Sequence, residues 1–126
     1  MRKNKKTVLI IEDDPWIVAP LRIAFKARGF EVLEASAAEE GLKIAERDRP
    51  DIILLDILMP RMDGFAVLEL LKKDDRTRGI PVFIVSNLSS DEDVERGLRL
   101  GAKKFFVKTK STLKNVVEEA VCEVEA

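Results

Sequence analysis

Hydrophobic positions in this chain gather into five short runs rich in β-branched residues, separated by stretches with helical spacing. The runs are TVLII (7–11), FEVLEA (30–35), DIILL (51–55), PVFIV (81–85) and KFFV (104–107). Near-continuous apolar runs of this length are typical of strands covered on both faces, whereas the alternating FEVLEA is typical of an edge strand. The alternation of strand and helix predicts an α/β fold, a three-layer (βα)5 doubly wound parallel sheet with crossover helices on both faces.

Signals for helix boundaries agree with this prediction. Asp14 and Pro15 have the pattern of an N-cap followed by a first helical residue, and Gly29 is placed to end that helix. Ser36 with Glu39 predicts a capping box at the start of the second helix. In the last segment one helical face collects the apolar residues Leu113, Val116, Val117, Ala120, Val121 and Val124.

Composition narrows the class of protein. A chain of 126 residues with 36% charged and 46% hydrophobic residues suits one soluble domain, which we place at residues 7–126 behind a basic tail at residues 1–6. The net charge of −1 and the short apolar runs predict no direct nucleic-acid binding and no membrane span. The single cysteine, Cys122, and the lack of histidine exclude an internal disulfide, a Cys/His zinc site and a histidine-based triad, and favour a cytoplasmic location.

Polar side chains follow four of the five predicted strands. Glu12, Asp13 and Asp14 follow the first, Asp56 the third, Ser86 the fourth and Lys108 the fifth. Because ligands of open parallel sheets bind beyond the carboxyl ends of the strands, we expect these groups to form one site.

Carboxylates held close together repel one another, so this arrangement predicts a bound cation. A few oxygen ligands without histidine or cysteine suit Mg²⁺, or Mn²⁺ in its place. Asp56 could then act as a nucleophile that takes up a phosphoryl group, with Lys108 and Ser86 holding the anion. Each residue alone has an ordinary explanation: Asp14, for instance, is equally a helix cap. The joint arrangement favours a site.

Four motifs in this order resemble the receiver domains of two-component response regulators, the CheY-like superfamily. They are VLIIEDDP (8–15), DIILLDILMPRMDG (51–64), PVFIVSN (81–87) and GAKKFFVK (101–108), and the resemblance covers essentially the whole chain. It implies a flavodoxin-like fold with strand order 2-1-3-4-5. It also implies that the chain is a receiver alone, which is a signalling switch and not an enzyme beyond its own phosphorylation and dephosphorylation.

The resemblance also implies roles for individual residues. Asp56 matches the phosphoacceptor, Glu12 and Asp13 match the acidic metal-binding pair, and the backbone carbonyl of Leu58 matches a third metal ligand beside Asp56. Ser86 and Lys108 match the phosphate-sensing hydroxyl and lysine, and Phe105 matches the aromatic switch position. Phosphorylation would draw Ser86 inward and let Phe105 turn in, which changes the surface formed by the fourth and fifth helices and the fifth strand of the sheet.

Three departures from the family pattern bear on mechanism. Thr109 replaces the usual proline after Lys108, so the conformation of that peptide stays open. Asn87 replaces a small residue after Ser86. Leu58 and Leu88 are apolar where many members are polar, so we expect them to flank the phosphoryl group, hinder attacking water and slow dephosphorylation.

The predicted phosphodonor is a histidine kinase or phosphotransfer protein, acting with Mg²⁺. The downstream target is an unknown protein, and the switch would be a monomer or a phosphorylation-dependent dimer. One alternative is a receiver-like interaction module that works without phosphorylation, although such modules usually lack the acidic pair, the acceptor or the lysine. A flavin protein or a Mg²⁺-dependent phosphohydrolase fits less well, because acids follow the first strand and Leu58 stands where a hydrolase has a second acid.

Overall fold

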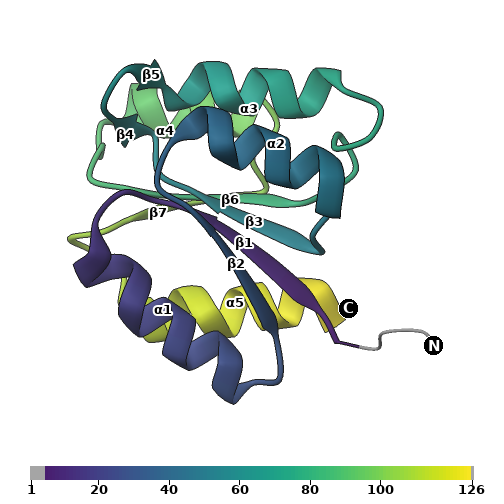
Figure 1. Ribbon diagram of the computed structural model, residues 1–126. Helices are drawn as coiled ribbons and strands as arrows, with labels where there is room; N and C mark the ends of the chain where they lie inside the picture. The colour runs from purple at the N-terminus through teal and green to yellow at the C-terminus, as the bar shows by residue number, and fades with distance from the viewer. Residues whose placement is uncertain (1–4, 126) are drawn as a thin grey trace.

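The computed structural model describes residues 5–125 and contains a five-stranded parallel sheet between two layers of helices (Figure 1). The elements follow in chain order: β1 (Thr7–Ile11), α1 (Pro15–Ala27), β2 (Glu31–Ala35), α2 (Ala38–Asp48), β3 (Ile52–Leu55), β4 (Leu58–Met59), β5 (Met62–Asp63), α3 (Gly64–Lys73), β6 (Val82–Ser86), α4 (Asp91–Arg99), β7 (Lys104–Val107) and α5 (Leu113–Glu125). The sheet order is β2-β1-β3-β6-β7. Counting the strands of this sheet alone, the order is 2-1-3-4-5, so the predicted flavodoxin-like fold is confirmed, with β2 at an edge as expected.

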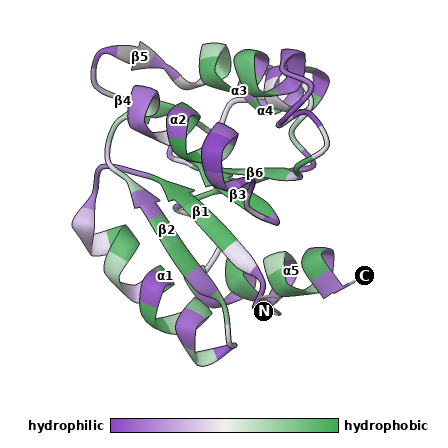
Figure 2. Cartoon of the chain, turned by 45° about the vertical axis from the view of Figure 1, so that its right-hand side comes forward, coloured by the Kyte–Doolittle hydropathy of each residue, from purple (hydrophilic) through white to green (hydrophobic). Residues whose placement is uncertain are grey.

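The two faces of the sheet build two separate hydrophobic cores. Leu9 and Ile11 of β1 face the core beneath α2, α3 and α4, whereas Val8 and Ile10 face the core beneath α1 and α5. This division follows from the alternation of side chains along a strand. Figure 2 shows the consequence, since the central strands are hydrophobic along most of their length while the helices are hydrophobic on one side.

The helix boundaries agree with the sequence at α1 and α5 but not at α2. Asp14 caps α1, and its carboxylate accepts a hydrogen bond from the Trp16 backbone N–H at 2.9 Å. The predicted capping box of Ser36 with Glu39 is wrong, because α2 begins at Ala38 with Ala37 as an N-cap without a side-chain bond. Glu40 takes the role expected of Glu39, because its carboxylate accepts a hydrogen bond from the Ser36 N–H at 3.2 Å. The helix starts one residue later than the motif suggested.

A small antiparallel hairpin, β4 with β5, interrupts the path from β3 to α3. The sequence pattern did not reveal it, since each strand has only two residues. Gly64 follows it and lies so close to Ile57 that an added Cβ would fall 2.3 Å from the Ile57 Cα. The Gly64 N–H also donates to the Ile57 carbonyl at 3.1 Å. This close approach fixes the loop that leaves β3 directly after Asp56. The glycine of the MDG motif is therefore needed for the backbone around the site.

Candidate phosphoacceptor site

The parallel register of the sheet brings the strand ends together. Ile11 is in register with Leu55, Leu55 with Ile84, and Ile84 with Phe105. The residues that follow at the carboxyl edge therefore lie side by side. Glu12, Asp56, Ser86 and Lys108 meet there, as the sequence predicted.

Lys108 binds both buried carboxylates of this group. Its Nζ lies 2.8 Å from Glu12 Oε1 and 3.2 Å from Asp56 Oδ2. Glu12 is 5% exposed and Asp56 4% exposed, so the positive charge of the lysine offsets two negative charges that are largely removed from water. Lys108 directly follows β7, Glu12 follows β1 and Asp56 follows β3, so the ion pairs also connect the ends of three strands.

The second oxygen of each carboxylate accepts a backbone hydrogen bond from two residues further along the chain. Asp56 Oδ1 accepts from the Leu58 N–H at 3.0 Å, and Glu12 Oε2 accepts from the Asp14 N–H at 3.1 Å. Both side chains are thereby held in one orientation. Asp56 Oδ2 faces Lys108, so an anionic group placed next to this oxygen would lie close to the positive charge of the lysine.

Burial and the neighbouring charges shift the pKa values of Glu12 and Lys108. Burial raises the pKa of Glu12 to about 7, helped by the charge of Asp56 and opposed by the hydrogen bond from Lys108. Burial lowers the pKa of Lys108, but the hydrogen bond to Glu12 and the charge of Asp56 together outweigh it and leave that pKa raised. Lys108 therefore stays charged at neutral pH, while Glu12 is close to its midpoint.

Glu12, Asp13 and Asp56 can together hold a cation. Each offers a carboxylate oxygen, and these oxygens lie within 4.8 Å of one another. Asp13 is exposed whereas the other two are buried, so one side of the group is open to solvent. Three oxygen donors with an open side fit a hard ion that retains water, such as Mg²⁺. Asp14 lies outside this group because its carboxylate caps α1.

A model of the response regulator receiver domain matches residues 8–118. The chain belongs to this family. It is 35% identical over 101 residues to the protein PilH of Pseudomonas aeruginosa, an alignment that covers 80% of this chain and 84% of PilH. The chain spans less than half the length of several other curated relatives that it matches.

Solved receiver structures share the whole fold. A CheY-like receiver domain protein from Methanospirillum hungatei is 27% identical, with a TM-score of 0.88, and the match covers 97% of this chain and 95% of the other. The receiver domain of the sensor histidine kinase PA1611 from Pseudomonas aeruginosa is 20% identical, with a TM-score of 0.84 and 97% and 99% coverage. The latter structure has a magnesium ion coordinated in its active-site cleft.

The remaining predicted residues of this receiver domain are Ser86, Leu58, Leu88 and Phe105, and they differ in burial and in contacts. Ser86 is fully buried; its Oγ accepts a hydrogen bond from the Leu88 N–H at 3.3 Å, and its carbonyl accepts from the Lys108 N–H at 2.8 Å. Leu58 is 51% exposed beside Asp56. Leu88 is half-buried and packs on the core beneath α2, α3 and α4. Phe105 is half-buried against the same core and does not join the carboxylate cluster.

Thr109 and Asn87 are the two departures from the family pattern that lie in loops after strands of the sheet. The peptide bond between Lys108 and Thr109 is trans, like every other peptide bond in residues 5–125. Asn87 is exposed. The open question about the Lys108–Thr109 peptide is thereby answered.

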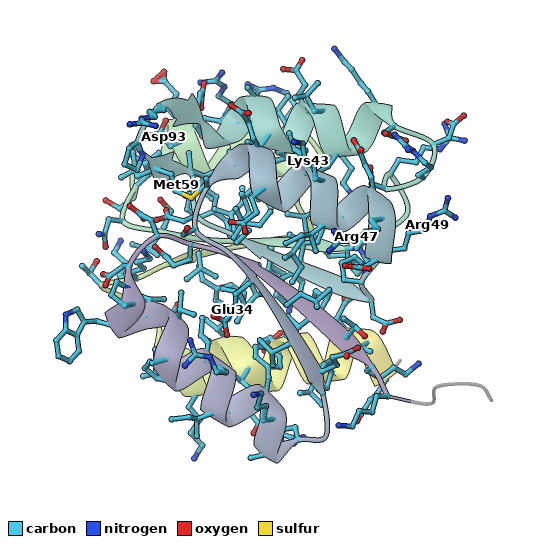
Figure 3. All side chains as sticks on the ribbon, viewed as in Figure 1. Glu34, Lys43, Arg47, Arg49, Met59 and Asp93 are labelled. Atoms are coloured by element: carbon cyan, nitrogen blue, oxygen red, sulfur yellow. The ribbon has the colours of Figure 1, made fainter. Side chains whose placement is uncertain are left out.

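One ion pair close to the site was missed by sequence reasoning. Arg22 of α1 binds Glu34 of β2 through two nitrogen–oxygen contacts, one of them 2.9 Å. Figure 3 shows Glu34 on the α1 side of the sheet. The two residues line a groove that also reaches Glu12 and Asp13. The pattern offered no signal for this pair, since Arg22 and Glu34 belong to separate elements and each has the usual polarity of a surface position.

Within residues 5–125, helices long and apolar enough to cross a bilayer are absent.

Proposed function

We propose that this chain is a phosphorylation-controlled switch in which Asp56 accepts a phosphoryl group. The observation that supports this best is the joint placement of three carboxylates, a buried serine and a half-buried lysine at one sheet edge. Receiver domains act as signalling switches, and the arrangement fits that role. Residues 7–126 would form one receiver domain behind the basic residues 1–6.

The transfer begins with attack by Asp56 Oδ2 on the phosphorus of the donor. A new oxygen–phosphorus bond forms, and the bond from phosphorus to the donor nitrogen or oxygen breaks with its electron pair on the leaving group. The product is an acyl phosphate. Lys108 is placed to accompany the incoming negative charge, because its Nζ already lies 3.2 Å from Asp56 Oδ2.

Glu12, Asp13 and Asp56 would hold Mg²⁺ or Mn²⁺, with the Leu58 carbonyl as a further ligand. The ion supplies positive charge that stabilises the transferring phosphoryl group. The magnesium in the cleft of the PA1611 receiver domain supports this assignment. The buried Glu12 and Asp56 also need positive charge, of which Lys108 supplies only one unit.

The phosphoryl group would then attract the hydroxyl of Ser86 and shift the loop that follows β6. In the resulting state Phe105 turns inward, and the surface formed by α4, β7 and α5 changes. The donor would be a histidine kinase or phosphotransfer protein, and the reader an unknown protein target. The protein would act in the cytoplasm as a monomer or a phosphorylation-dependent dimer.

Intact-mass spectrometry after incubation with Mg²⁺ and acetyl phosphate tests the proposal. We expect one added phosphoryl group on the wild type, and none on Asp56→Asn or in the presence of a chelator. Asp51→Asn is the matched control, because Asp51 lies at the opposite end of β3, where it accepts from the Thr7 N–H at 2.8 Å. An unmodified wild type, or equal modification of Asp56→Asn, would favour the phosphorylation-independent interaction module.

A further inference from the structure

Helix α4 is held on the sheet with very little apolar burial. Gly97 is the one buried residue in the fully described span of this helix, whereas α3 buries five residues and α5 four. Val94 is half-buried and Leu98 is 45% exposed. Because burial of apolar area supplies most of the free energy of docking, α4 depends heavily on the few contacts that it does make.

Gly97 packs closely against both Ile84 of β6 and Phe105 of β7. A Cβ added at Gly97 would lie 3.0 Å from Phe105 Cδ2, 3.3 Å from Phe105 Cε2 and 2.7 Å from Ile84 Cδ1. Ile84 is fully buried, so its methyl group has little freedom to move away. The ring of Phe105 therefore uses the space that a side chain at position 97 would take.

The backbone at Gly97 also connects α4 to the strand that carries Phe105. The Gly97 carbonyl accepts a hydrogen bond from the Ala102 N–H at 3.1 Å, two residues before β7 begins. Gly97 thus contacts the ring of Phe105 in β7 and also the turn that leads into this strand. A movement of the ring away from α4, or of α4 away from the sheet, breaks the first contact.

We propose that Gly97 is a positioning residue for the switch: its lack of a side chain lets α4 rest on the ring of Phe105, so that helix position and ring position change together. This inference rests on the proposed function and adds the residue that couples Phe105 to α4. A methyl group at position 97 competes with the ring for the same space and disfavours the arrangement seen here. Gly97 then contributes to the coupling between the position of Phe105 and the position of α4.

The first test follows the unliganded protein by NMR. In Gly97→Ala we expect the Phe105 ring and Ile84 δ1-methyl signals to shift well beyond those in Glu95→Ala, a variant at an exposed position of the same helix. Thermal stability is a poor readout, because alanine is a better helix former than glycine and the two effects oppose each other. Equal shifts in the two variants would overturn the contact as a determinant of ring position.

The second test measures the affinity of beryllofluoride with Mg²⁺ as a phosphoryl mimic. We expect Gly97→Ala to change the dissociation constant about fivefold, and the change to be clearly smaller when Phe105→Leu is also present, since a smaller side chain at position 105 removes the competition with the ring while the contact with Ile84 remains. The sign reports which of the two states the present arrangement resembles. An unchanged affinity, or the same change with and without Phe105→Leu, would overturn the inference.

The two tests separate this inference from the proposed function. Failure of the wild type to bind beryllofluoride would count against the function, and the NMR comparison would still decide whether Gly97 positions the ring. Binding by the wild type with no coupling between positions 97 and 105 would leave the function intact and remove Gly97 from it.

Discussion

Lys108 joins the two buried carboxylates of the site, with its Nζ 2.8 Å from Glu12 Oε1 and 3.2 Å from Asp56 Oδ2. One cation therefore serves two anions from different strands. A phosphoryl group on Asp56 would add negative charge next to this lysine, so the balance between its two partners would change. The same ion pairs thus affect both the stability of the fold and the chemistry of the site.

Removal of the Lys108 charge should destabilise the metal-free protein. In Lys108→Met the side-chain length is kept, but the buried carboxylates of Glu12 and Asp56 lose their positively charged partner, so we expect a loss of about 2–4 kcal/mol in the free energy of unfolding. Urea denaturation measures this. Lys110→Met is the control, since Lys110 is exposed. Saturating Mg²⁺ should restore part of the loss in Lys108→Met, and equal stability of the two variants would contradict the role of the pair.

The stability of the metal-free protein should fall as pH rises from about 4.5 to about 7. Burial raises the pKa of Glu12 from 4.5 to about 7 in the folded protein. A group that binds its proton more tightly when folded stabilises the fold while protonated, and this contribution is lost as the pH rises through the folded pKa. We expect a change on the order of 2–3 kcal/mol, reduced in Glu12→Gln and by added Mg²⁺. A free energy of unfolding of the wild type that does not change with pH over this range would refute the prediction.

The position of Asp56 could be predicted from the sequence because burial dictates it. DIILL must be a strand covered on both faces, so the next residue emerges at the carboxyl edge of the sheet. The different roles of Glu12, Asp13 and Asp14 could not be derived in this way. All three are acidic neighbours, and only the exact start of α1 decides that Asp14 caps the helix while the other two face Asp56.

Tertiary contacts explain the rest of what the sequence withheld. Gly97 has the appearance of an ordinary weak position in a helix, and its proximity to Phe105 depends on how α4 docks. The hairpin β4–β5 is too short to leave a periodic signal. The α2 capping box failed because the helix begins at Ala38, one residue later than an N-cap at Ser36 would give, and the Ser36 N–H then donates to Glu40.

Polar residues in place of Leu58 and Leu88 should speed the loss of the phosphoryl group. Leu58 is 51% exposed beside Asp56, where its bulk can hinder attacking water. We expect Leu58→Asn with Leu88→Asn to increase the decay rate about tenfold, measured by the loss of the phosphorylated mass after removal of the donor. Leu70→Asn is the control, because Leu70 is 48% exposed on α3. Unchanged decay in the double variant would show that the leucines do not slow hydrolysis.

A cation–π contact should contribute measurably to the position of α4. The guanidinium carbon of Arg96 lies 4.2 Å from the ring centroid of Phe65, which connects α4 to the first turn of α3. We expect Arg96→Met to lose about 0.5–1 kcal/mol in the free energy of unfolding. Arg99→Met is the matched control, since Arg99 lies on the same helix and makes an exposed ion pair with Glu95 at 3.7 Å.

Amide hydrogen exchange would show where the Arg96 contact acts. If it holds α4 to α3, protection should fall in α4 of Arg96→Met and stay unchanged in α5. The effect of Arg96→Met should also shrink when Phe65→Leu is present, because the aromatic face is already gone. Equal effects of Arg96→Met and Arg99→Met would mean that the ring contact contributes nothing beyond surface charge, and α4 would then depend on Gly97 and its half-buried neighbours alone.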